Sequence, residues 1–153
     1  METREALPDL AAMAAYGARI AAQLRAGDVV ALEGGLGAGK TTLARAILAA
    51  LGHVGEVPSP TFTIIETYAA PPLHLAVVHA DFYRLEDPSE LAEIGLDDYR
   101  EDAVLLAEWP DHAGGFSREP GCLAISLAPI GESGEGGRIA IARGGADWVG
   151  RMP

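Results

Sequence analysis

A glycine-rich segment carries a lysine and a threonine at a spacing that suits phosphate chemistry. Residues 34–41 read Gly-Gly-Leu-Gly-Ala-Gly-Lys-Thr, so Gly34 and Gly39 are five positions apart and Lys40 and Thr41 follow directly. Glycines let successive backbone N–H groups turn inward around phosphate oxygens, and the N-terminus of a following helix adds partial positive charge. The lysine supplies a compact charge for the phosphates, and the threonine hydroxyl is a ligand for Mg²⁺. The segment predicts a phosphate-binding loop (P-loop).

The use of basic residues supports this prediction. Lys40 is the only lysine in the chain, which has ten arginines. A lysine ammonium is a point charge, whereas an arginine presents a planar fork of donors. The chain therefore uses arginine wherever a plain positive charge suffices and keeps its one lysine for the phosphate-binding position.

Two acidic residues end apolar runs and are candidates to hold Mg²⁺ or its water. Asp81 follows the largely apolar run 75–80, and Glu108 follows the run 104–107. An acid at the end of a strand is also common on a plain surface. Together with a P-loop in the same small chain, however, at least one of the two is expected to function, and the spacing leaves open which one.

The remaining polar and aromatic residues carry weaker signals. The four histidines lack metal-ligand spacing and are given no role: His53, His74, His79 and His112. On chemistry alone, Trp109 either covers a nucleotide or fills the core, and its assignment to the core is favoured. The acidic positions 97–98, 101–102 and 132–135 are predicted to be solvent-facing, and the single cysteine, Cys122, is predicted to be a buried small hydrophobe in a reducing compartment.

Hydrophobic periodicity predicts the elements that position these residues. Residues 10–24 show helical spacing, with Asp9 as the N-cap, and a second helix over the residues after Lys40 ends at Gly52. Strands are predicted at 28–33, 61–68, 73–81 and 103–108, a short helix starting at 87–90, and a hairpin of 122–127 with 138–142. A strand, a loop, a helix and then mostly strands indicate an α/β sandwich with a mixed sheet flanked by helices.

Length and charge limit the class of protein. The 153 residues predict one domain, 1–153. A net charge of −11 repels phosphate backbones and anionic lipids, so the chain alone is not expected to bind tRNA strongly or to bind membranes. No targeting segment or membrane-length apolar stretch is apparent, and the predicted location is cytoplasmic.

Missing motifs exclude several classes of P-loop protein. An Asn-Lys-x-Asp guanine motif needs a second lysine, a Leu-Ser-Gly-Gly signature is absent, and a motor with a helical lid needs a longer chain. A small-molecule kinase, with Asp81 as general base, remains the alternative function, although Arg84, Arg100 and Arg118 are scattered and not clustered. A nucleotide-binding switch with no meaningful turnover differs from an ATPase only in rate and also remains open.

Five ordered motifs, lying between about residues 7 and 128, resemble the TsaE (YjeE) family, the P-loop ATPases of bacterial tRNA threonylcarbamoyladenosine (t6A) synthesis. The motifs are GGLGAGKTT at 34–42, SPTFT at 59–63, HADFYRL at 79–85, GLDDY at 95–99 and EWP at 108–110. The resemblance implies a single-domain P-loop NTPase fold, ATP or ADP with Mg²⁺, and hydrolysis that is slow in the isolated chain. It also implies association with the TsaB–TsaD heterodimer, whose turnover the ATPase supports.

The resemblance further implies roles for individual residues. Lys40 and the loop amides would hold phosphates, Thr41 and Glu108 would be Mg²⁺ ligands, and Asp81 would orient water or lie behind the ligands. Thr61 would sense the γ-phosphate, and Trp109 would lie near the nucleotide. The implied nucleotide contacts are Gly35, Leu36, Gly37, Ala38, Gly39, Lys40, Thr41, Thr42 and Trp109.

Overall fold

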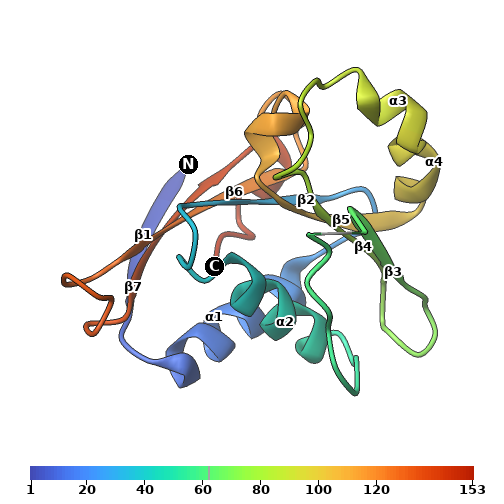
Figure 1. The fold of residues 1–153 in the computed structure, drawn as a ribbon. Helices are drawn as coiled ribbons and strands as arrows, with labels where there is room; N and C mark the ends of the chain where they lie inside the picture. The colour runs from blue at the N-terminus through green and yellow to red at the C-terminus, as the bar shows by residue number, and fades with distance from the viewer. Residues whose placement is uncertain (62) are drawn as a thin grey trace.

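The apolar runs form the middle of one mixed seven-stranded sheet in the computed structural model, which describes residues 1–61 and 63–153 (Figure 1). The strands are β1 (Glu2–Leu7), β2 (Val29–Glu33), β3 (Ile65–Tyr68), β4 (Ala76–Asp81), β5 (Ala103–Glu108), β6 (Cys122–Pro129) and β7 (Arg138–Gly144). Their order across the sheet is β1-β7-β6-β2-β5-β4-β3. β6, β2, β5 and β4 run parallel, whereas β1, β7 and β3 are antiparallel to their neighbours. The predicted mixed sheet is confirmed.

Parallel pairing brings the predicted functional acids to one edge. β4 and β5 pair in a register that sets Asp81 opposite Glu108. β2 pairs with β5 so that Leu32 lies opposite Glu108, and the chain then leaves β2 into the P-loop. The carboxyl ends of these three strands therefore lie together, which is where ligands bind in open α/β sheets.

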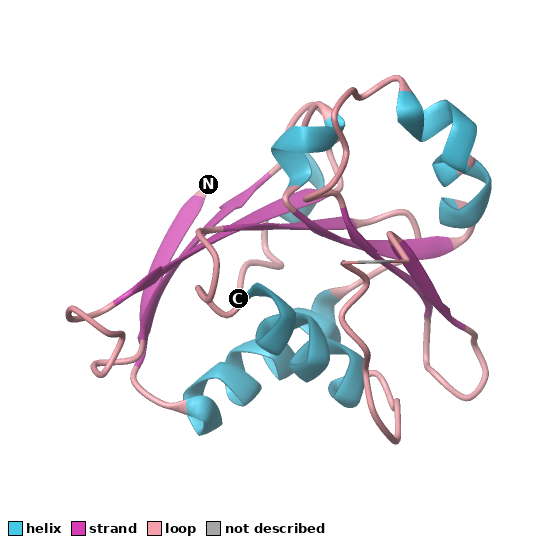
Figure 2. Cartoon of the chain, viewed as in Figure 1, coloured by secondary structure: helices cyan, strands magenta, loops and turns pink. Residues whose placement is uncertain are grey.

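Helices cover both faces of the sheet (Figure 2). One face carries α1 (Leu10–Gln23) and α2 (Lys40–Ala50), and the other carries α3 (Glu90–Ile94) and α4 (Leu96–Arg100) (Figure 1). α1 and α2 approach closely at Gly17, where an added Cβ would lie 2.6 Å from the Cβ of Ala46. Two short 3-10 turns, η1 (Pro110–Ala113) and η2 (Ala146–Trp148), complete the fold.

The two long helices follow the sequence prediction closely. The Asp9 side chain caps α1 by accepting a hydrogen bond from the Ala12 amide at 2.8 Å. Leu10 was expected on the buried face but is 75% exposed, because it is the first residue of the helix and lies beyond the edge of the core. On α2 the buried face includes Leu43 and Ile47 as predicted.

Two elements lack a sequence signal, and two predicted strands are too long, of which the one predicted at 73–81 begins at Ala76. β1 is an edge strand in which four of six residues are polar and only Leu7 is buried, and α4 is a five-residue helix with four charged or aromatic members. The strand predicted at 61–68 begins only at Ile65, because Pro60, Thr61 and Thr63 lie in turns and Ile64 has φ 67°, outside the extended region. Phe62, which falls in that predicted strand, lies outside the described residues.

The C-terminal part of the chain completes the sheet. β6 and β7 form the predicted hairpin, and Cys122 is buried at the start of β6, as expected. The Arg151 guanidinium lies against both carboxylate oxygens of Asp28, at 2.8 and 3.1 Å, and so ties the C-terminal residues to the start of β2. In the part of the chain that the structure describes, no helix has the length and apolarity needed to cross a membrane.

Candidate functional site

The P-loop connects β2 to α2 and needs glycine at particular points. Gly34 has φ 143°, and a Cβ there would lie 2.6 Å from the Leu127 carbonyl oxygen of β6. Gly39 caps the N-terminus of α2 with φ 108°, a conformation that side chains other than glycine rarely adopt. The loop therefore turns tightly against β6 and presents the helix N-terminus to the space above it.

Lys40 is held inside the loop. Its side chain is 5% exposed, and Nζ donates to the carbonyl oxygens of Gly34 and Gly35 at 2.8 and 2.7 Å. Nζ also lies 4.3 Å from the centre of the Trp109 ring, within cation–π range. Burial lowers the pKa of the Lys40 ammonium, and the carboxylates of Glu108 and Asp81 partly oppose this shift.

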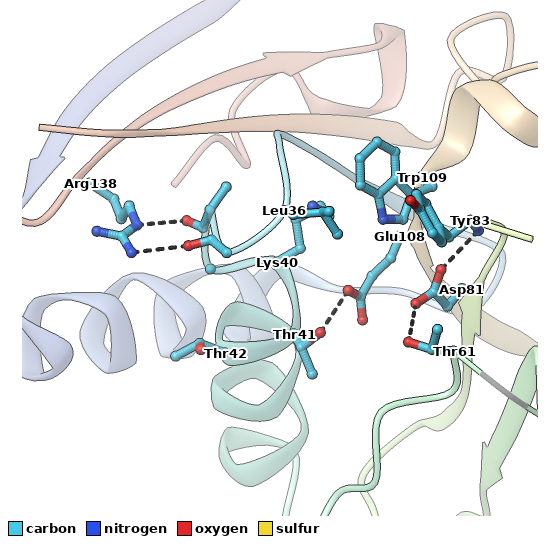
Figure 3. A pocket seen from close by; sticks show the side chains of 13 residues that line it. Leu36, Lys40, Thr41, Thr42, Thr61, Asp81, Tyr83, Glu108, Trp109 and Arg138 are labelled. Atoms are coloured by element: carbon cyan, nitrogen blue, oxygen red, sulfur yellow. Dashed lines mark hydrogen bonds between the residues drawn. The ribbon is translucent and has the colours of Figure 1, made fainter. Parts of the chain in front are cut away.

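Glu108 and Thr41 place two oxygen atoms side by side that could both bind a metal ion. Thr41 Oγ1, in the first turn of α2, donates to Glu108 Oε1 at 2.7 Å (Figure 3). Glu108 Oε2 lies 2.6 Å from Nε2 of His79, so both carboxylate oxygens have a partner. A hydroxyl next to a carboxylate is a donor set that suits a hard cation such as Mg²⁺.

Asp81 has a separate set of partners. Its Oδ2 accepts from Thr61 Oγ1 at 2.9 Å, and its Oδ1 accepts from the backbone amide of Tyr83 at 2.9 Å (Figure 3). Ser59 Oγ lies 2.9 Å from the same Thr61 hydroxyl. Asp81 thereby links the end of β4 to the loop that precedes β3.

These residues surround one cavity of about 320 Å³. Its lining includes every residue predicted as catalytic, nucleotide-binding or metal-binding except Gly35, whose carbonyl oxygen instead holds Lys40. Tyr83 and Arg138 also line the cavity and were not predicted.

Arg138 reaches the P-loop from β7, and the loop residues that it bonds, Ala38 and Gly37, precede it by 100 and 101 positions. Its Nε donates to the Ala38 carbonyl oxygen at 2.9 Å and its Nη2 to the Gly37 carbonyl oxygen at 3.0 Å (Figure 3). Its Nη1 donates to the carbonyl oxygens of Gly134 and Gly137 in the turn before β7. No spacing rule relates residue 138 to a motif at 34–41, so only the fold reveals this contact.

Trp109 lies in the cavity wall and not in the core, so its assignment to the core on chemistry alone is wrong. The residue has φ 55°, and this left-handed turn directly after β5 brings the ring over Lys40. The Tyr83 ring packs against it at 5.0 Å between centroids, and the His112 ring lies 5.4 Å away. Non-glycine residues in this backbone region concentrate at functional sites.

A family model and curated relatives identify the same family for this chain. The family model "Threonylcarbamoyl adenosine biosynthesis protein TsaE" matches residues 7–135. A curated relative named tRNA threonylcarbamoyladenosine biosynthesis protein TsaE, from Haemophilus influenzae, is 45% identical over 92 residues, which are 60% of this chain and 57% of that protein. The protein of the same name from Mycobacterium bovis is 44% identical over 110 residues, 67% of this chain and 66% of that protein.

The matches to these two relatives thus cover about three fifths to two thirds of their length. Among solved structures, the crystal structure of Bacillus subtilis YdiB superposes with a TM-score of 0.75 at 27% identity. That superposition covers 99% of this chain and 91% of YdiB. The whole sheet and its flanking helices are therefore shared with a known structure.

Proposed function

The chain belongs to the TsaE family, and from this premise we propose that it binds and hydrolyses ATP with Mg²⁺ as a component of tRNA t6A biosynthesis. We further propose that it acts together with the TsaB–TsaD heterodimer and supports the turnover of that complex. Hydrolysis is slow in the isolated chain under this proposal. The cytoplasmic location remains a prediction that belongs with it.

One observation carries the proposal: a lysine, a hydroxyl and a carboxylate converge on one cavity at the N-terminus of α2. Lys40, Thr41 and Glu108 all line it, and Thr41 and Glu108 are hydrogen-bonded to each other. Backbone amides at a helix N-terminus favour anions, and the adjacent oxygens favour a divalent cation. A nucleotide phosphate chain with its Mg²⁺ ion is a ligand that needs both environments side by side.

Each residue then has a distinct task. The amides of residues 35–41 bind phosphate oxygens, and Lys40 exchanges its two carbonyl partners for the phosphates. Thr41 and Glu108 would hold Mg²⁺, which neutralises charge on the phosphoryl oxygens when it is bound. Asp81 orients the attacking water or supports the ligands. Thr61, already bonded to Asp81, responds to the γ-phosphate.

The net charge of the chain supports the proposal that the partner proteins, and not this chain, bind tRNA. With a net charge of −11, the chain is poorly suited to hold tRNA by itself. The acidic positions Asp97, Asp98, Glu101 and Asp102 are all exposed, as predicted. We therefore assign the basic tRNA-binding surface to the partner proteins.

The kinase alternative receives no particular support from the site. Among the described residues, Arg138 is the one arginine that lines the cavity, and four main-chain carbonyl oxygens occupy its donors. A transferred phosphoryl group is typically clamped by arginine or lysine side chains that are available to it.

The test is nucleotide binding and turnover by Lys40→Ala. Loss of one preorganised contact to a phosphoryl group typically costs about 10²–10³ in rate. We expect a loss of this size in ATP hydrolysis, together with weaker ADP binding in calorimetry. Arg118→Ala is the matched control, because it removes the same charge from an exposed position outside this cavity. Normal ATP hydrolysis by Lys40→Ala would show that the P-loop assignment is wrong.

A further inference from the structure

A buried histidine behind the site has one polar contact among the described residues, and that contact is with Glu108. His79 lies on β4 and is 0% exposed. Its Nε2 lies 2.6 Å from Glu108 Oε2, while its Nδ1 is buried and has no hydrogen-bond partner among the described residues. Leaving a buried polar atom without a hydrogen bond destabilises the folded protein.

Packing alone gives no reason for an imidazole at this position. Side chains alternate along a strand, so residues 77, 79 and 81 of β4 share the face that carries α1 and α2. Val77 on this strand and Leu106 on β5, which pairs with His79, both belong to the apolar core of that face. An aliphatic side chain would satisfy the same surroundings without an unpaired nitrogen.

The hydrogen-bond arrangement defines what His79 does. An ionised carboxylate only accepts hydrogen bonds, so Nε2 of His79 is the donor in this contact. Glu108 is then held at both oxygens, by Thr41 at Oε1 and by His79 at Oε2. The two contacts come from different elements, α2 and β4, and together they hold both oxygens of the carboxylate.

We infer that His79 is a positioning residue that orients Glu108 for the divalent cation. This inference rests on the proposed function, in which Thr41 and Glu108 hold Mg²⁺. Residues that orient a metal ligand typically change metal affinity or activity about 10–100-fold when they are replaced. His79 accordingly sets how strongly Mg²⁺ and the nucleotide reinforce each other, although it touches neither.

Three substitutions separate this role from packing. His79→Leu keeps an apolar side chain of similar size without a donor. His79→Gln places an amide N–H at about the reach of Nε2, and His79→Asn is equally polar but too short to reach Glu108. Thermal unfolding of each variant is measured first, and the pair Gln and Asn provides the comparison even if Leu fails to fold.

The readout is ADP affinity by calorimetry, measured once in excess Mg²⁺ and once in EDTA. The quantity compared is the dissociation constant in EDTA divided by the dissociation constant in Mg²⁺. We expect His79→Leu and His79→Asn to reduce the wild-type ratio by about tenfold or more, with affinity in EDTA unchanged. His79→Gln should keep most of the ratio. The catalytic rate at saturating Mg·ATP should fall in the same order.

The outcomes are distinguishable. Equal ratios for wild type and a folded His79→Leu, or equal ratios for Gln and Asn, overturn the inference and leave the proposed function intact. If wild type itself binds ADP equally well with and without Mg²⁺, the proposed metal pair is wrong and the inference fails with it.

Discussion

The two carboxylates of the site, those of Glu108 and Asp81, have different hydrogen-bond partners. Glu108 bonds to Thr41 at the start of α2, next to the P-loop lysine, whereas Asp81 bonds to Thr61 in the loop before β3. The first arrangement suits a cation ligand, and the second suits a group that reports the position of a loop. Sequence spacing did not decide which of the two acids holds the cation. The hydrogen bonds lead to the hypothesis that Glu108 holds it and that Asp81 contacts the loop before β3.

This division predicts different losses for two isosteric substitutions. Glu108→Gln should reduce Mg²⁺-dependent hydrolysis by about 10²-fold or more while ADP affinity in EDTA stays near that of wild type. Asp81→Asn should keep the Mg²⁺ enhancement of ADP binding but lower the hydrolysis rate. Steady-state ATPase assays and calorimetry measure both effects, with the exposed Asp97→Asn as control. If Asp81→Asn alone removes the Mg²⁺ enhancement, the roles of the two acids are exchanged.

At the scale of elements, the P-loop is supported by a strand that is remote in sequence. Arg138, the first residue of β7, bonds to the carbonyl oxygens of both Gly37 and Ala38, while Gly34 packs against Leu127 of β6. The hairpin of β6 and β7 thus shapes the loop that β2 and α2 deliver. Since Arg138 gives its donors to main-chain oxygens, its contribution is to the conformation of the loop.

Arg138→Met should therefore weaken ATP binding in a protein that still folds. Loosening the loop by about 1.4 kcal/mol would raise KM for ATP roughly tenfold, and a loss of that size lowers Tm by only a few degrees in a chain of this length. Arg143→Met is the matched control on the same strand, because its ion pair with Glu2 is exposed and worth about 0–1 kcal/mol. An unchanged KM in Arg138→Met would contradict the proposed support of the loop.

Helices and strands with a local apolar pattern or a cap could be predicted from the sequence. Helix α1 with its Asp9 cap, the strands β2 and β5, and the β6–β7 hairpin have local patterns of apolar residues and caps, and all were predicted. The edge strand β1 was missed because its stability comes from backbone pairing with β7 and not from an apolar face. Contacts such as those of Arg138 and His79 depend on strand order and register, which no local pattern encodes.

At the scale of the whole molecule, the sheet buries the single cysteine, Cys122, so the reactivity of its thiol can be used to measure unfolding. Cys122 is 3% exposed, and burial raises the pKa of its thiol to about 12, with Glu119 and Glu33 adding to the shift. The thiolate is the reactive form, and the raised pKa keeps the thiol almost entirely protonated at pH 8. Reaction with a thiol reagent must therefore wait until the sheet opens.

Thiol labelling at pH 8 should accordingly be very slow in the folded protein and should give one modified thiol per chain in denaturant. Mg·ADP at about 100 times its dissociation constant stabilises the folded state by roughly 2.7 kcal/mol, so labelling should slow about 100-fold further. Mass spectrometry of quenched samples follows the reaction. Rapid labelling without denaturant, or labelling unaffected by Mg·ADP, would show that Cys122 becomes accessible through a local opening unrelated to the nucleotide site.

The most direct measurement for the account as a whole is the ATP turnover rate of the purified chain, alone and with its own TsaB–TsaD pair. We expect slow turnover that Lys40→Ala lowers by about 10²–10³-fold and that rises when the pair is added. A rate that the pair leaves unchanged, in a preparation where wild type hydrolyses ATP and binds the pair, would contradict the proposed partnership. Absence of any Mg²⁺-dependent turnover under both conditions would contradict the ATPase itself.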